Sequence, residues 1–82
     1  KILVCHGEAD EMVTSENVQE FSREMDRLGA DYLIKTYPEA LHGFTNPATT
    51  ALGQKYGIPV GYNETADRQS WEELKDFLSE NL

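Results

Sequence analysis

The 82 residues are enough for one small domain, near the lower limit at which a hydrophobic core offsets the cost of ordering the chain. Hydrophobic residues make up 39% of the sequence, and 15 acidic against 7 basic residues give a net charge of −8. So acidic a surface repels phosphate backbones and anionic lipid headgroups, which argues against nucleic-acid and membrane binding. The single cysteine excludes an internal disulfide framework and suits a reducing compartment, so we expect a cytoplasmic protein.

The first half of the chain predicts a strand, a helix and a second strand. Residues 2–5 are continuously apolar, as in a parallel strand that is buried on both faces. Thr14 or Ser15 can cap a helix that runs to about Leu28, with apolar residues recurring at helical spacing. Residues 31–37 are rich in β-branched and aromatic side chains and predict the second strand. The short links predict a right-handed βαβ unit with parallel strands.

The second half predicts a long loop and a final helix. Residues 38–63 show no regular period, apart from one or two helical turns expected within 50–56. A loop of this length in a compact protein is more often functional than idle. Thr65 is the predicted cap of a last helix over about 66–80. The residues expected on its buried face are Trp71, Leu74, Phe77 and Leu78.

Two polar segments follow the two predicted strands. Cys5 to Asp10 comes after the first strand, and His42 to Pro47 comes after the second. Catalytic groups gather at the carboxyl edge of parallel strands, and neighbouring strands lie about 4.8 Å apart, so Asp10 and His42 are expected to meet. In that pair Asp10 accepts the Nδ1 proton of His42, and Nε2 is left to activate a thiol or hydroxyl. The sequence offers no convincing nucleophile for this base.

Three motifs match one enzyme family. They are H-G-x-x-D at 6–10, H-G-F-T-N-P at 42–47 and A-D-R-x-S-W at 66–71, the last two being the more specific. On these motifs nearly the whole chain resembles the dienelactone hydrolase family of the α/β-hydrolases. The resemblance implies an α/β fold, namely the C-terminal β-α-β-loop-α portion of an α/β-hydrolase with parallel strands. We therefore expect residues 1–82 to form a single partial domain.

The resemblance also implies a Cys/Ser-His-Asp triad, with Asp10 as its acid and His42 as its base. The nucleophile would lie upstream in a G-x-C/S-x-G elbow, which these residues lack. The parent enzyme would hydrolyse an ester or lactone carbonyl of a small molecule, with no cofactor and no metal. The 82-residue chain alone is expected to be inactive, because both the nucleophile and the oxyanion hole would be missing.

Phe44 and Asn46 are the expected substrate-binding residues. Dienelactone hydrolases proper tend to carry an Arg shortly after the catalytic His, where it holds the substrate carboxylate. This chain has Asn46 in that region and no Arg between His42 and Arg68. The difference favours a broader esterase over a lactone-acid hydrolase.

Each of these residues also has a structural alternative. Asp10 can serve only to hold a loop, and His42 can be a lone surface histidine. We expect Cys5 to be a buried core thiol and His6 to be a structural, hydrogen-bonded histidine. The alternative function is a non-catalytic βαβ module that self-associates as a homo-oligomer through exposed sheet edges. A nucleotide-binding unit is disfavoured, because Gly7 stands alone where a phosphate cradle needs several glycines.

Overall fold

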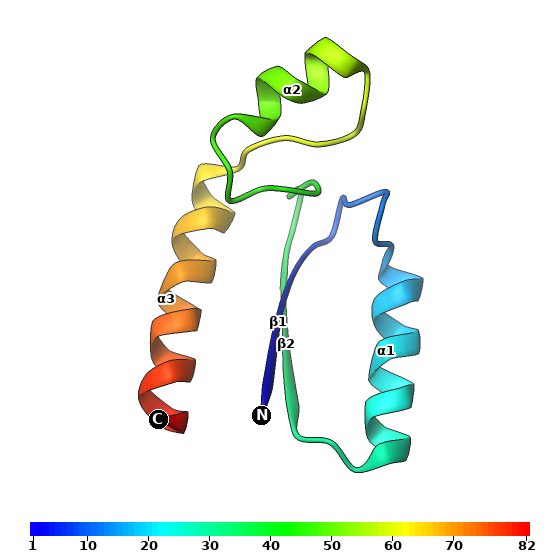
Figure 1. The fold of residues 1–82 in the computed structure, drawn as a ribbon, viewed down its shortest axis with the longest axis vertical. Coiled ribbons are helices and arrows are strands. Elements are labelled where there is room, and N and C mark those ends of the chain that lie inside the picture. Colours follow the sequence, from blue (N-terminus) through cyan, green and yellow to red (C-terminus); the bar gives the residue numbers. More distant parts are fainter.

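The computed structural model describes residues 1–82 and has the predicted α/β class. Its elements in chain order are β1 (Ile2–Gly7), α1 (Ser15–Leu28), β2 (Tyr32–Tyr37), α2 (Thr49–Tyr56) and α3 (Glu64–Asn81). The two strands lie in the centre between α1 and α3, and α2 stands beyond the ends of the strands (Figure 1). None of these helices combines the length and the hydropathy that crossing a bilayer requires.

The two strands are parallel, as predicted. Their register pairs Ile2 with Tyr32 at one end and Gly7 with Tyr37 at the other. β1 therefore continues beyond the predicted segment 2–5. Because both strands run the same way and stop level with each other, the loops that follow them leave from the same edge of the sheet. This edge carries both polar segments of the sequence.

The boundaries of α1 follow from its caps. Thr14 Oγ1 accepts the N–H of Asn17 at 3.2 Å, and Asn17 Oδ1 accepts the N–H of Thr14 at 3.0 Å. This reciprocal pair satisfies two N–H groups that would otherwise lack a partner at the start of the helix. At the other end Gly29 adopts a φ of 69°, a left-handed conformation that glycine takes without strain. The helix therefore begins and ends where the sequence predicts.

The long loop leaves β2, forms α2 and returns to its own starting point. The N–H of Gly61 donates to the carbonyl of His42 at 3.3 Å, and the N–H of Asn63 donates to the carbonyl of Phe44 at 3.1 Å. His42 and Val60 also form an isolated parallel bridge. These contacts hold the backbone at His42 against the segment that returns from α2.

The start of α3 differs from the prediction. Asn63, not Thr65, is the N-cap, and its Oδ1 accepts the N–H of Ala66 at 3.0 Å. Asn and Thr are both good capping residues, so local sequence does not separate them. Asn63 takes the position because its extended backbone is already bonded to Phe44, which sets where the chain can turn into a helix.

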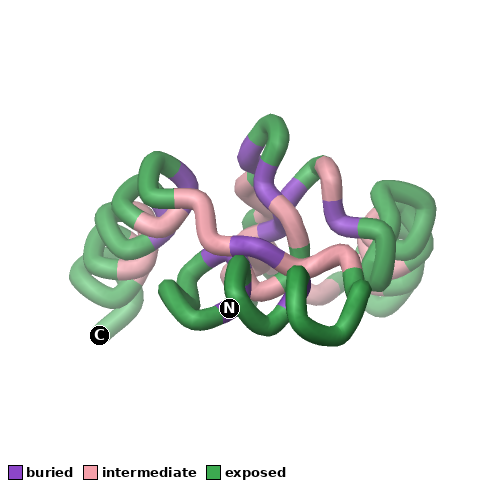
Figure 2. The backbone as a smooth tube through the Cα atoms, turned by 90° about the horizontal axis from the view of Figure 1, so that it is seen from above, coloured by how far each residue is buried: buried purple, intermediate pink, exposed green.

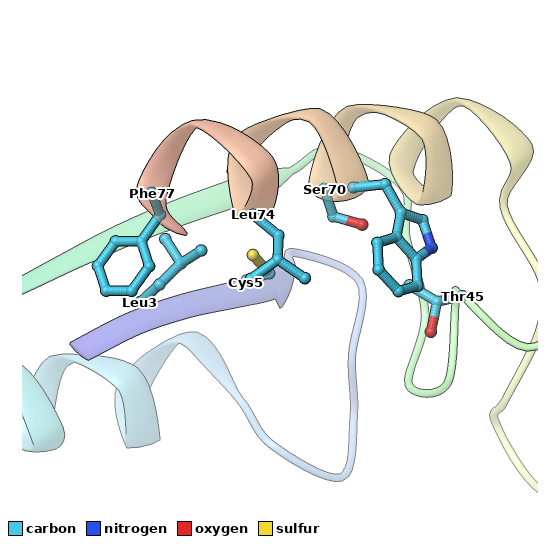
Figure 3. A pocket seen from close by; sticks show the side chains of 7 residues that line it. Leu3, Cys5, Thr45, Ser70, Leu74 and Phe77 are labelled. Atoms are coloured by element: carbon cyan, nitrogen blue, oxygen red, sulfur yellow. The ribbon is translucent and has the colours of Figure 1, made fainter. Parts of the chain in front are cut away.

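The buried face of α3 also differs from the prediction. Its buried residues are the small Ala66 and Ser70, whereas Trp71 is 57% exposed and Leu78 is exposed as well. Of the α3 residues, only the small Ala66 belongs to the apolar core, together with Tyr37, Ala40 and Phe44. A groove of about 340 Å³ lies between α3 and β1 (Figure 3). Its lining is Leu3, Cys5, Thr45, Ser70, Trp71, Leu74 and Phe77.

The core is small and lies just below the edge where the strands end. Only 11 of the 82 residues are buried, and the outward faces of the helices are exposed (Figure 2). The buried apolar residues are Tyr37, Ala40, Phe44 and Ala66. Cys5 packs against this cluster but is only partly buried, short of the core position predicted for it. The ends of the strands are therefore the most firmly packed part of the chain.

Tyr37 joins this core to α3. Its ring packs on that of Phe44 with the centroids 5.4 Å apart, and its hydroxyl donates to Glu73. Burial, together with the hydrogen bond to Glu73, raises the pKa of Tyr37, so the hydroxyl stays protonated and remains a donor. The last residue of β2 is thus tied to both the loop and the helix around the site.

Candidate active site

The loop after β1 is seated directly on the turn that follows β2. The N–H of Ala9 donates to the carbonyl of Ala40 at 3.0 Å, and the N–H of Asp10 donates to the carbonyl of Gly7 at 3.0 Å. A Cβ on Gly7 would lie 2.3 Å from the carbonyl oxygen of Ala40. Only glycine permits this approach, which brings the Asp10 loop against the segment that leads to His42.

The Asp10 carboxylate is buried and fully engaged. Its Oδ1 accepts the N–H groups of Met12 at 2.7 Å and Val13 at 2.9 Å, and its Oδ2 lies 3.0 Å from Nδ1 of His42. Burial acts to raise the pKa, but the Val13 and Met12 amides and the hydrogen bond and charge of His42 outweigh it. The pKa of Asp10 therefore lies below its usual value, and the group is a carboxylate at neutral pH.

His42 has one nitrogen engaged and one unused. A carboxylate can only accept, so Nδ1 carries the proton that it donates to Asp10. When the ring is neutral, Nε2 then holds a lone pair, and it makes no hydrogen bond within the chain. The side chain is 45% exposed, against 7% for that of Asp10. A buried carboxylate thus orients a half-exposed histidine whose other nitrogen has no partner in the chain, an arrangement that suits a general base.

A hollow of about 250 Å³ adjoins this pair. Besides Asp10 and His42, its lining is mostly apolar and comes from β1, the start of α1 and the His42 loop. Phe44, one of the two predicted substrate-binding residues, lines the hollow but is itself buried against Tyr37. Asn46 lies outside it, and its Oδ1 accepts the N–H of Ala48 at 3.0 Å.

Two features around the pair were not predicted from the sequence. One is the pair of backbone N–H groups that donate to Oδ1 of Asp10. Asp side chains often accept a hydrogen bond from the backbone N–H two residues later in a turn, so the sequence did carry a signal for it. The other is the partner of His6: its Nε2 lies 2.7 Å from the carbonyl oxygen of Val13. His6 is therefore hydrogen-bonded, as expected. No three His, Cys, Asp or Glu side chains converge closely enough to hold a metal ion.

Comparison with known proteins identifies the family. The sequence model of the dienelactone hydrolase family matches residues 1–82. The chain belongs to the dienelactone hydrolase family. This is a family of hydrolases.

Two relatives show how much of a longer protein the chain matches. An uncharacterized protein of Caenorhabditis elegans is 33% identical over 79 residues, which are 96% of this chain and 48% of that protein. A solved dienelactone hydrolase-like promiscuous phosphotriesterase from metagenomic libraries is also 33% identical, with a TM-score of 0.83 over 95% of this chain and 31% of its own. The chain thus spans about half the length of the curated relative and about a third of the solved one.

The lowered pKa of Asp10 predicts that this member of the dienelactone hydrolase family loses folding stability in acid. The unfolded carboxyl, with a pKa of about 3.9, binds more protons than the folded one. Its contribution to the free energy of unfolding is therefore complete above the unfolded pKa and is lost as the pH falls through the folded pKa. Between about pH 5 and pH 2 we expect stability to fall more steeply in the unmodified protein than in its Asp10→Asn variant.

Urea denaturation at a series of pH values measures this difference. Asp76→Asn, which removes an exposed carboxylate from α3, is the matched control and is expected to keep the slope of the unmodified protein. Equal slopes for the unmodified protein and Asp10→Asn would contradict the prediction.

Proposed function

We propose that the full-length protein hydrolyses carboxylic esters or lactones by nucleophilic catalysis, with residues 1–82 forming the C-terminal part of its catalytic domain. A Cys or Ser outside these residues attacks the carbonyl carbon while Nε2 of His42 takes its proton. His42 returns that proton to the departing alkoxide, and Asp10 holds the Nδ1 proton and stabilises the imidazolium. Water then cleaves the acyl-enzyme, with His42 again as the base.

The 3.0 Å bond between Nδ1 of His42 and Oδ2 of Asp10 carries this proposal. It joins groups from the ends of two neighbouring parallel strands, and it leaves Nε2 without a partner in the chain. Further polypeptide beside β1 is supported by the small number of buried residues and by the apolar groove along that strand. It is also supported by the greater length of both relatives.

Trapping the acyl-enzyme of the full-length protein tests the proposal. The substrates are p-nitrophenyl acetate, p-nitrophenyl butyrate and an aliphatic δ-lactone, each quenched in acid during turnover. We expect hydrolysis of the esters and an intact mass raised by one acyl group, which peptide mapping places on a Cys or Ser outside residues 1–82. Failure to hydrolyse any of these substrates would overturn the proposed activity. An acyl group on a residue within 1–82 would overturn the division of the triad.

Phosphotriester hydrolysis is a second candidate, because the similar solved structure is that of a promiscuous phosphotriesterase. The same nucleophile and base suffice for it, since attack at phosphorus again needs a deprotonated thiol or hydroxyl. Diethyl p-nitrophenyl phosphate, run beside the esters at equal concentration, separates the two. The ester is expected to have the higher kcat/KM, and the reverse order would make the phosphotriester the preferred substrate class.

A further inference from the structure

A second histidine is buried next to the proposed acid and base. His6 lies near the end of β1 and is only 5% exposed. Its Nε2 is 2.7 Å from the carbonyl oxygen of Val13. A carbonyl oxygen only accepts, so Nε2 of His6 carries a proton and donates it. The ring therefore reaches from the strand to the far end of the loop that carries Asp10.

Val13 connects this hydrogen bond to the Asp10 carboxylate. The N–H of Val13 donates to Oδ1 of Asp10 at 2.9 Å, while Oδ2 receives the Nδ1 proton of His42 at 3.0 Å. One continuous series of hydrogen bonds thus runs from His6 through the Val13 residue to Asp10 and on to His42. Asp10 itself aside, His6 is the one side chain bonded to the backbone of residues 11–13.

Packing alone does not hold residues 11–13 in place. Met12 is 54% exposed and Val13 is exposed as well, although their N–H groups both orient the carboxylate. We propose that His6 is a positioning residue for the Asp10–His42 pair. Its bond to the Val13 carbonyl keeps the two amides on Oδ1 and so directs Oδ2 toward Nδ1 of His42. The kinetic consequence of this role rests on the proposed function, while its structural consequence does not.

Two substitutions in the full-length protein separate the effect of losing the hydrogen bond from the effect of emptying the space that the ring fills. His6→Phe keeps a ring but has no donor, whereas His6→Gln places an amide N–H near the position of Nε2. Misplacement of a catalytic group by about 1 Å costs on the order of 10²-fold in rate. We expect His6→Phe to lower kcat for p-nitrophenyl acetate about 10- to 100-fold with KM little changed, and His6→Gln to restore most of it.

A double-mutant cycle with Asp10→Asn distinguishes positioning from a general structural effect. If His6 acts through the carboxylate, His6→Phe lowers kcat further by less than about 3-fold in the Asp10→Asn background. A general structural role predicts the same loss in both backgrounds. Ser70→Ala is the control: it removes a buried hydroxyl that donates to the Asp67 carbonyl at 2.9 Å, on α3. It is expected to lower thermal stability and leave kcat unchanged.

A readout that needs no substrate completes the test. The ¹H NMR resonance of the Nδ1 proton of His42 is expected to move and to exchange faster with water in His6→Phe but not in His6→Gln. Should His6→Phe fail to fold, His6→Asn, whose amide is too short to reach Val13, replaces it. An unmoved His42 proton, an unchanged kcat or an equal loss in both backgrounds would overturn the positioning role. If the unmodified protein is inactive but the resonance of the His42 Nδ1 proton still moves in His6→Phe, only the proposed function is overturned.

Discussion

Replacing His42 by alanine in the full-length protein is expected to lower kcat for the proposed ester hydrolysis on the order of 10⁶-fold. The variant keeps the Asp10 carboxylate but loses the group that removes the proton from the nucleophile. Because the His42 side chain is nearly half exposed and contributes no apolar core, KM is expected to change little. Loss of its hydrogen bond to the buried Asp10 carboxylate is expected to lower the free energy of unfolding by about 1 kcal/mol. Initial rates with p-nitrophenyl acetate, together with thermal denaturation, measure both parts of the prediction.

Asp10 provides the companion measurement. Asp10→Asn removes the acceptor for the Nδ1 proton and leaves His42 free to adopt the other tautomer, which costs up to about 10⁴-fold in such a pair. The two side chains act as a unit, so the double variant is expected to be no slower than His42→Ala alone. Multiplied losses in the double variant, or a tenth or more of the activity left in His42→Ala, would contradict the pairing.

The meeting of Asp10 and His42 was predictable because it depends on few facts. Two apolar strands separated by one helix become parallel neighbours, and a polar segment after each then lies at the same edge. The predicted contact is present at 3.0 Å. The caps at Thr14 and Gly29 were also predictable, because each depends only on residues within one turn of the helix.

Features that depend on distant contacts were not predictable in this way. Helical spacing places Trp71 on an apolar stripe, but the part of that stripe that meets the sheet depends on the position of β1 and on the small Ala66 and Ser70. The choice of Asn63 over Thr65 as cap depends on a bond to Phe44, nineteen positions earlier in the chain. The bond from His6 to Val13 needs the loop to fold back on its own strand, which no periodic pattern encodes.

Gly7 is the position where a single methyl group is expected to do most damage to the fold. A Cβ there would lie 2.3 Å from the carbonyl oxygen and 2.8 Å from the carbonyl carbon of Ala40. Neither atom can move aside easily, because Ala40 is completely buried and its oxygen already accepts the N–H of Ala9. We expect Gly7→Ala to lower the free energy of unfolding by about 3 kcal/mol, at the upper end of the cost of overpacking.

The same change is expected to reach the site, because relief of the clash separates the Asp10 loop from the turn that leads to His42. We therefore expect kcat to fall more than 10-fold in the folded fraction of Gly7→Ala, as about 1 Å of misplacement would produce. Gly29→Ala is the matched control: it strains a φ of 69° at the end of α1 but meets no atom within 4 Å. Its expected cost is about 1 kcal/mol with kcat unchanged. Urea denaturation measures the stability of both variants, and initial rates measure their kcat. Equal effects at Gly7 and Gly29 would show that the contact with Ala40 does not hold the two loops together.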